Sequence, residues 1–178
     1  MYKALSKIVN GLVFILLDID LNISFSSSFR ADIIPDFIGY IFVGLGCKML
    51  YDELGNEGLK KASFLAYILA VIEIFTIGIP FMPGFQHSHI VSIIAMLINV
   101  VAYTFFNENM DIEGYRKDIG RMASVTLLVF AFLVIFRQFE GNQFYGGALL
   151  IVGLSVIITG ITWFVSLNRL RKSFEALD

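Results

Sequence analysis

The sequence predicts an all-α protein, an integral membrane bundle of six transmembrane helices that forms one domain over residues 1–178. Three observations predict this class. Hydrophobic residues make up 57% of the chain, and charged residues make up only 16%. Six apolar stretches are each long enough to cross a bilayer. The basic residues gather at alternate ends of these stretches, as expected for a multi-pass membrane protein with both termini in the cytoplasm.

The composition also argues against several other classes of protein. Soluble domains average roughly 45 to 50% apolar and about 25% charged residues, whereas the mean hydropathy here is +0.79. A globule of 20.0 kDa has too small a core to bury so much apolar surface. A soluble enzyme, a nucleic-acid-binding protein, a disordered regulator and a disulfide scaffold therefore do not fit, and the lipid bilayer is the expected partner.

The apolar stretches have the length that a bilayer requires. A transmembrane helix needs about 20 mostly apolar residues, because each adds about 1.5 Å and the hydrocarbon core is about 30 Å thick. The first stretch is the least apolar, since Asp18, Asp20 and Asn22 follow the run GLVFILL. A basic start before an apolar run is also typical of a signal peptide, but the two aspartates favour a retained helix. The predicted spans are residues 8–25, 33–50, 62–81, 89–106, 122–139 and 146–167.

The second predicted span begins with residues that suit a helix N-terminus. Asp32 can cap the helix, and Pro35 suits the first turn because its missing N–H would be unpaired there. Asp36 faces the positive end of the helix dipole. The alternative interpretation is that Asp36 is a binding carboxylate beside Tyr40, which lies one turn away on the same face.

Polar connections separate the later spans and carry five of the 13 basic residues. The segments YDELGNEGLKK and NENMDIEGYRKDIGR follow the second and fourth spans, and Pro83-Gly84 marks a turn after the third. If both termini are on one side of the membrane, only Arg30 and Arg137 fall on the opposite side. Because Lys and Arg accumulate in cytoplasmic loops, this pattern predicts cytoplasmic termini in a bacterial plasma membrane. The basic residues on the predicted cytoplasmic side are Lys3, Lys7, Lys48, Lys60, Lys61, Arg116, Lys117, Arg121, Arg169, Arg171 and Lys172.

Ionisable side chains inside the spans identify the candidate site, because a charge near the bilayer centre needs a partner or a cavity. Asp18 and Asp20 lie about 15 and 18 Å from the cytoplasmic end of the first span, and Glu73 about 16 Å into the third. We therefore expect a net acidic cavity open to the outside. The residues expected to line it are Asp18, Asp20, Asp36, Tyr40, Glu73, Asn99 and Arg137.

Each of these residues also has a structural interpretation. On a helix Asp18 and Asp20 point some 200° apart, so both face one pocket only if the first helix unwinds at Asp-Ile-Asp. Glu73 is either a hydrogen-bonded contact, for instance to Asn99, or a carboxylate that binds a proton or a cation. Arg137 either extends to the outer interface or forms a salt bridge with an aspartate.

Other reactive residues do not form a recognisable motif. Cys47 has no second cysteine to pair with and is interpreted as a small apolar residue. His87 and His89 lack a third ligand at suitable spacing, so no metal site is predicted. Nucleotide loops, serine-hydrolase elbows and zinc-protease motifs are absent from the sequence, and no cofactor is predicted.

Small residues recur on two of the predicted spans. Ala62, Ala66 and Ala70 repeat every four positions, and Gly153 and Gly160 lie on the last span. Such residues let helices approach closely, either within the chain or against a partner subunit. Internal packing is the favoured interpretation, and docking of a partner in the cytoplasmic half is the alternative.

The stretch GLVFILLDIDLN followed by IIPDFIGYIFVGLGCKML resembles a group of small multi-pass membrane proteins of Gram-positive bacteria. That group has an acidic first helix followed by a Leu-Pro-Asp-x-Ile-Gly-Tyr segment, which here runs from Ile34 to Tyr40. The resemblance covers about the first fifty residues and implies no activity. In architecture the chain also resembles the substrate-binding subunits of energy-coupling-factor vitamin transporters, but its first span lacks their alanine stripe.

Three functions remain open from the sequence. The first is a protein that binds or transports a small cationic or polar solute through Asp18, Asp20, Asp36 and Glu73. The second is a non-catalytic membrane partner or regulatory subunit of another membrane protein. The third is an intramembrane enzyme with paired carboxylates, which the opposed directions of Asp18 and Asp20 disfavour.

Overall fold

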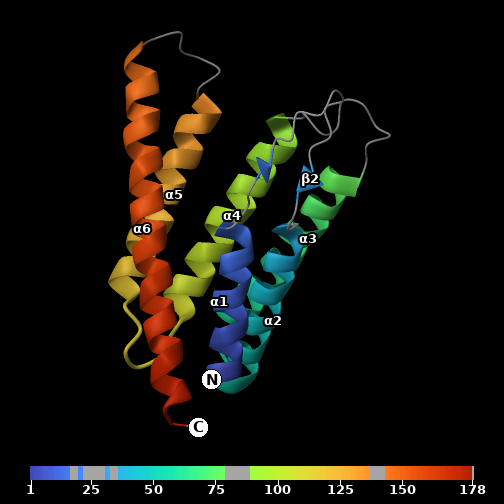
Figure 1. The fold of residues 1–178 in the computed structure, drawn as a ribbon, viewed down its shortest axis with the longest axis vertical. Helices are drawn as coiled ribbons and strands as arrows, with labels where there is room; N and C mark the ends of the chain where they lie inside the picture. Colours follow the sequence, from blue (N-terminus) through green and yellow to red (C-terminus); the bar gives the residue numbers. More distant parts are fainter. Residues whose placement is uncertain (17–19, 22–30, 33–35, 79–88, 137–142, 178) are drawn as a thin grey trace.

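The computed structural model describes residues 1–16, 20–21, 31–32, 36–78, 89–136 and 143–177. Over these ranges the chain is helical apart from one pair of two-residue strands (Figure 1). The strands are antiparallel, with Asp20 opposite Asp32. The elements are α1 Tyr2–Leu16, β1 Asp20–Leu21, β2 Ala31–Asp32, α2 Asp36–Leu54, α3 Glu57–Gly78, α4 His89–Asn109, α5 Lys117–Phe136 and α6 Gln143–Glu175.

The all-α class is confirmed, but the first predicted helix is too long. α1 ends at Leu16, and Asp20–Leu21 forms a strand, so a helix continuing to residue 25 is wrong. Asp and Asn side chains compete for backbone hydrogen bonds and disfavour helix interiors, which accounts for the extended backbone in this acidic segment. The last helix, in contrast, continues eight residues beyond the predicted end at residue 167 and stops at Glu175.

Two of the described helices are long and apolar enough to cross a membrane. They are α5 and the Tyr145–Glu175 part of α6. Two of the six predicted spans therefore meet the requirements of a transmembrane helix by length and composition.

The helices form an antiparallel bundle in which each packs on the next in sequence, and α6 also packs on α1. Figure 1 shows the α5–α6 hairpin on one side, α1, α2 and α3 on the other, and α4 between them. Both chain ends lie at one end of the bundle, where the Tyr2 hydroxyl donates to Glu175 Oε1 at 3.2 Å. We call this the terminal end, and we call the opposite end, where α2, α4 and α6 begin, the distal end.

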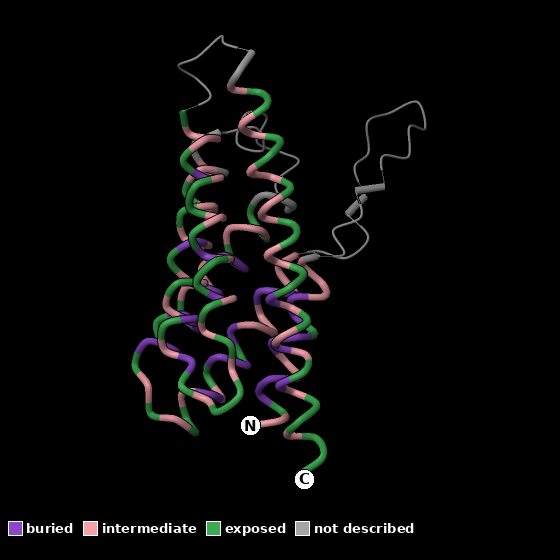
Figure 2. Tube along the Cα trace, turned by 90° about the vertical axis from the view of Figure 1, so that its left-hand side faces the viewer, coloured by how far each residue is buried: buried purple, intermediate pink, exposed green. Residues whose placement is uncertain are grey.

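The hydrophobic core is concentrated towards the terminal end, where most of the buried residues lie (Figure 2). Leu5 and Ile8 of α1 are at most 1% exposed, as are Leu50 of α2, Leu59 of α3 and Leu167 of α6. Residues 5 and 8 lie on one face of α1, so this helix fills the space between α2 and α6. The core therefore holds the helices together in the half of the bundle at the terminal end. Fewer side chains are buried at the distal end.

Glycines let α1 and α2 approach closely. A Cβ at Gly11 would lie 2.6 Å from the Gly39 carbonyl oxygen, and a Cβ at Gly39 would lie 2.7 Å from the Gly11 carbonyl oxygen. One heptad away, a Cβ at Gly46 would lie 2.8 Å from the Ala4 carbonyl oxygen. Two small residues seven apart on each helix thus form the contact, which is the close-packing pattern expected between apolar helices.

The alanine repeat of α3 packs inside the chain. Ala62, Ala66 and Ala70 are 2 to 3% exposed, and Ser63 Oγ donates to the Gly44 carbonyl at 2.8 Å on α2. The interpretation as internal packing is confirmed. The repeat consequently offers no surface on which a partner subunit could dock.

A short turn joins α2 and α3 at the terminal end. Gly55 has a φ of 70°, a left-handed conformation that glycine adopts without steric cost, and its N–H donates to the Tyr51 carbonyl at 2.7 Å. Asn56 Oδ1 then accepts from the Gly58 N–H at 3.0 Å and caps α3. This turn fixes the antiparallel register that brings α2 and α3 together at the distal end.

Candidate functional site

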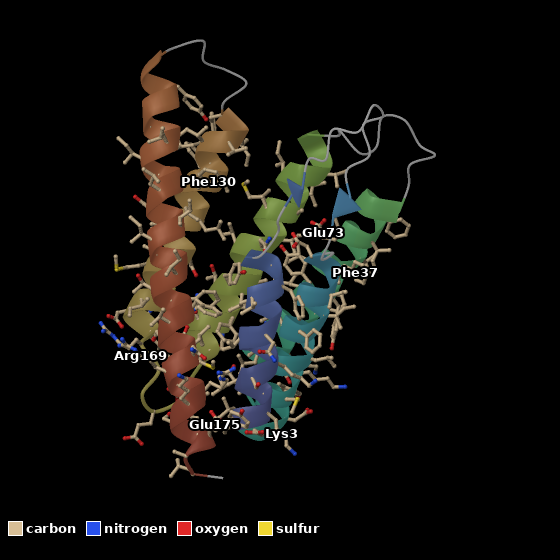
Figure 3. The ribbon with its side chains drawn as sticks, viewed as in Figure 1. Lys3, Phe37, Glu73, Phe130, Arg169 and Glu175 are labelled. Atoms are coloured by element: carbon tan, nitrogen blue, oxygen red, sulfur yellow. The ribbon has the colours of Figure 1, made fainter. Side chains whose placement is uncertain are left out.

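Four predicted site residues come together at the distal end, on three different helices. Asp36 begins α2, and Tyr40 lies one turn further along it. Glu73 lies near the end of α3 and Asn99 in the middle of α4. Because α3 runs antiparallel to α2, the end of α3 lies beside the start of α2, as the positions of Glu73 and Phe37 show in Figure 3. We call Asp36, Tyr40, Glu73 and Asn99 the Tyr40 cluster.

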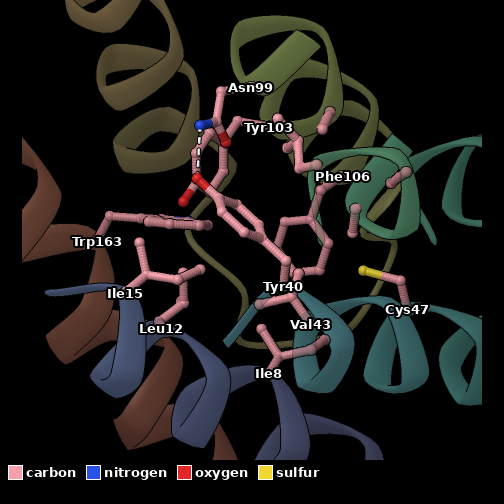
Figure 4. Close-up of a pocket in the computed structure, with 14 residues that line it drawn as sticks. Ile8, Leu12, Ile15, Tyr40, Val43, Cys47, Asn99, Tyr103, Phe106 and Trp163 are labelled. Atoms are coloured by element: carbon pink, nitrogen blue, oxygen red, sulfur yellow. Dashed lines mark hydrogen bonds between the residues drawn. The ribbon is translucent and has the colours of Figure 1, made fainter. Parts of the chain in front are cut away.

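Tyr40 is the centre of this cluster. Its side chain is 7% exposed and packs against Leu69 and Ala70 of α3. Asn99 Nδ2 donates to the Tyr40 hydroxyl oxygen at 2.8 Å (Figure 4). The Tyr103 hydroxyl and the Glu73 and Asp36 carboxyl groups lie close enough to act on that hydroxyl electrostatically. Two acidic groups, a phenol and an amide therefore share one small region between α2, α3 and α4.

The other three predicted site residues are not placed in the cluster by the structure. Asp18 and Arg137 are outside the described residues, as is His87. Asp20 lies in β1 opposite Asp32, which places its backbone in the short antiparallel pair after α1. Of the seven residues that were predicted to line one acidic cavity, four are therefore members of the Tyr40 cluster.

The space on the terminal side of Tyr40 is small and apolar. A cavity of about 20 Å³ lies between α1, α2, α3, α4 and α6, and Figure 4 shows the side chains of Ile8, Val43 and Phe106 around it. This volume is close to that needed for a single water molecule, and an apolar cavity of this size stays dry. The cavity is therefore too small to hold more than about one water-sized molecule.

Cys47 lines the same cavity. Its side chain is 1% exposed and belongs to the hydrophobic core, consistent with its interpretation as a small apolar residue. Within the described ranges, no three His, Cys, Asp or Glu side chains are grouped closely enough to hold a metal ion.

A second polar cluster was not predicted from the sequence. Asn107 of α4 is 1% exposed, and its Nδ2 donates to the Gly120 carbonyl at 3.0 Å and to Ser124 Oγ at 2.9 Å. The Tyr115 hydroxyl donates to Asn107 Oδ1 and accepts from Trp163 Nε1 at 2.9 Å. We call Asn107, Tyr115, Ser124 and Trp163 the Tyr115 network.

The Tyr115 network has a structural role. It joins α4, the following loop, α5 and α6 with hydrogen bonds that satisfy both amide hydrogens of Asn107. Burial raises the pKa of the Tyr115 phenol, which lies in the loop outside the predicted spans. The one sequence signal for this network is Trp163, because a buried indole N–H requires an acceptor.

An ion pair on the surface supports the same region. Arg121 Nε and Nη2 donate to the two Glu108 carboxylate oxygens at 2.7 and 2.8 Å. This bidentate bond lowers the pKa of Glu108, which lies beyond the predicted end of the fourth span at residue 106. Its position at the terminal end separates it from the Tyr40 cluster.

Comparison with known proteins gives no assignment for the Tyr40 cluster. No protein-family model, curated protein or solved structure matches this chain. Its function must consequently be argued from the arrangement of its own residues.

Proposed function

We propose that this chain is a multi-pass protein of a bacterial plasma membrane that binds a small cationic or polar solute at the Tyr40 cluster. The observation that carries the proposal is the hydrogen bond from Asn99 of α4 to the Tyr40 hydroxyl of α2, with the carboxyl groups of Asp36 and Glu73 nearby. Two further features support it: the apolar outer surface of the helices and the distribution of basic residues along them.

The outer surface of the α5–α6 hairpin supports a place in the bilayer. Only 17% of the most apolar stretch of α5 is buried, and only 6% of that of α6. A core helix of a soluble protein would be mostly buried. Large apolar side chains such as Phe132, Ile151 and Ile158 are 56 to 66% exposed, and exposed apolar area of this kind is stable in contact with lipid.

The charges support an orientation with both termini in the cytoplasm. Eleven of the 13 lysines and arginines belong to the terminal halves of the helices and to the α4–α5 loop, whereas the Tyr40 cluster lies at the distal end. The positive-inside rule then places the terminal end in the cytoplasm and the cluster towards the outside. α6, with 33 residues, is about 50 Å long and extends beyond a hydrocarbon core of about 30 Å.

The chemistry of the cluster favours a cation or an ammonium group. Ionised Asp36 and Glu73 are acceptors only, and Asn99, whose amide nitrogen donates to Tyr40, retains its carbonyl oxygen as a further acceptor. Carboxylate and carbonyl oxygens are the ligands that hard cations prefer, and they also accept hydrogen bonds from ammonium groups. Tyr40 and Asn99 both line the small apolar cavity on the terminal side of the cluster.

Thermal unfolding of the purified protein in detergent tests the solute proposal. Metal cations and small organic ammonium compounds are compared at constant ionic strength. A bound solute at 100 times its Kd stabilises the folded state by about 2.7 kcal/mol. We expect at least one cation to raise the unfolding midpoint of the wild type, and we expect Glu73→Gln and Asp36→Asn to lose most of that shift.

The matched control is Glu113→Gln, which removes one carboxylate from the α4–α5 loop, far from the cluster. Its cation-dependent shift should equal that of the wild type. The proposal is contradicted if no cation shifts the midpoint, or if the shift survives unchanged in both cluster variants.

A further inference from the structure

A surface groove lies beside α6 at the terminal end, away from the Tyr40 cluster. It has a volume of about 520 Å³ and runs between α6 and the loop that joins α4 to α5. Arg169 lines it from α6, and Arg116 lines it from the loop. Figure 3 shows Arg169 on the outer side of α6, directed away from α1, α2 and α3. The groove therefore opens towards the surroundings of the bundle rather than into its core.

The two arginines differ in what they contact. Arg116 Nη2 pairs with Asp118 Oδ2 at 2.6 Å, so its guanidinium already has an anionic partner. Arg169 makes no hydrogen bond or ion pair with any residue that the structure describes. Ser166, one turn before Arg169 on the same helix, places a hydroxyl in the same groove. The groove thus offers one available guanidinium and a neighbouring hydroxyl to an anionic group.

The apolar part of the groove continues along the outer face of α6. Ile161 and Val165 line the groove, and with Leu154 and Ile158 they form a row at helical spacings of three and four residues. These four side chains are 40 to 64% exposed. Arg169 is the next position in the row, four residues after Val165. The face of α6 therefore passes from exposed apolar side chains to an exposed arginine at the terminal end.

We propose that this groove binds an anionic phospholipid, with the phosphate at Arg169 and an acyl chain along the row from Val165 to Leu154. The inference depends on the proposed position of the chain in a membrane, with the terminal end at the cytoplasmic leaflet. Arg binds phosphate through paired N–H groups in a planar fork. Basic pockets beside transmembrane helices on the cytoplasmic side are suited to acidic headgroups. Free phosphate would use only the polar half of the groove.

Native mass spectrometry of the full chain in detergent tests this site. Short-chain phosphatidylglycerol, short-chain phosphatidylcholine and inorganic phosphate are titrated separately. We expect phosphatidylglycerol to bind more tightly than either of the others. Arg169→Gln should weaken phosphatidylglycerol binding about tenfold, the usual effect of losing a hydrogen bond to a charged group.

Two further variants define the site. Lys172→Gln removes the same charge from an exposed position on α6 outside the groove and should change the affinity less than twofold. Ser166→Leu fills the groove without changing the charge and should weaken phosphatidylglycerol binding as Arg169→Gln does. Equal losses of phosphatidylglycerol affinity in Arg169→Gln and Lys172→Gln would indicate a diffuse surface charge and overturn the proposal. The proposal is also overturned if phosphatidylcholine or inorganic phosphate binds as tightly as phosphatidylglycerol.

Failure of the lipid site can be distinguished from failure of the proposed membrane location. If alkaline carbonate extracts the expressed chain from membranes, both proposals fail. If the chain stays in the membrane and phosphatidylglycerol shows no preference for the groove, the lipid site alone is wrong.

Discussion

Asn99 on α4 donates a hydrogen bond of 2.8 Å to the hydroxyl of Tyr40 on α2, two helices that are separated by α3 in the sequence. This bond closes the Tyr40 cluster, because Glu73 on α3 and Asp36 on α2 both interact with the same hydroxyl. The distal part of α2 is therefore tied to the middle of α4 by this bond, and Tyr40 also packs against Leu69 and Ala70 of α3.

Tyr40→Phe removes this hydroxyl and should destabilise the protein by about 1 kcal/mol. This value lies within the range that hydrogen bonds between transmembrane helices contribute to stability. Tyr51→Phe is the control, since the Tyr51 hydroxyl donates to Glu57 on the surface, away from the cluster, and it should cost less than about 0.5 kcal/mol. The free energy of unfolding in detergent measures both. An equal cost for the two variants would show that the Tyr40–Asn99 bond does not join the helices.

Gly39→Ala should destabilise the α1–α2 contact by about 1 to 3 kcal/mol, the usual cost of overpacking. The new Cβ would lie 2.6 Å from Ile15 Cγ1 and 2.7 Å from the Gly11 carbonyl oxygen, so the two helices must move apart. Gly160→Ala is the matched control, because its Cβ meets nothing within 4 Å and alanine favours a helix. The unfolding midpoint should fall for the first variant and stay level or rise for the second.

Tyr115→Phe should cost about 1 to 3 kcal/mol, because it leaves Asn107 Oδ1 and Trp163 Nε1 without their partner. Tyr51→Phe removes a hydroxyl that donates to Glu57 on the surface, and we expect it to cost less than about 0.5 kcal/mol. Trp163 is the only tryptophan, so its fluorescence also reports the change at the indole directly. Unchanged stability and fluorescence in Tyr115→Phe would contradict the role assigned to the Tyr115 network.

The Glu108–Arg121 ion pair predicts a pH dependence at the terminal end. The pKa of Glu108 is lower in the folded chain than its ordinary value of 4.5, so the pair stabilises the fold above about pH 4.5. That contribution is lost as the pH falls through the lowered pKa. The difference in unfolding free energy between the wild type and Glu108→Gln should therefore shrink from neutral pH towards acid. A difference that stays constant over this pH range would contradict the role of the ion pair.

Composition and apolar length were sufficient to predict the all-α class and the approximate positions of the helices. The end of α1 could not be placed in the same way, because the apolar run suggested a span continuing through Asp18 and Asp20. The strand at Asp20–Leu21 reflects a local preference of acidic residues that a hydropathy count does not measure. The glycine contact between Gly11 and Gly39 also depends on which helices are neighbours, and that is a property of the fold.

All seven candidate site residues were grouped from the sequence because depth along each span places them in its middle or outer half, and the structure brings four of them together. Depth alone does not give the rotation of a helix, so the Tyr40–Asn99 bond emerged only from the fold. The Tyr115 network lies in and beside a polar connection, where Asn and Tyr are common and attract no notice. Its members are brought together by the path of the loop between α4 and α5.

The accessibility of position 73 tests most directly whether the Tyr40 cluster is an outward-facing site. Glu73→Cys is made in a Cys47→Ala background, so that it carries the only thiol, and intact cells are treated with a membrane-impermeant thiol reagent. We predict labelling at position 73 from outside the cell, and labelling of the control Lys61→Cys only after the cytoplasmic side is exposed. Labelling of position 73 only from the cytoplasm, or from neither side, would contradict the proposed site.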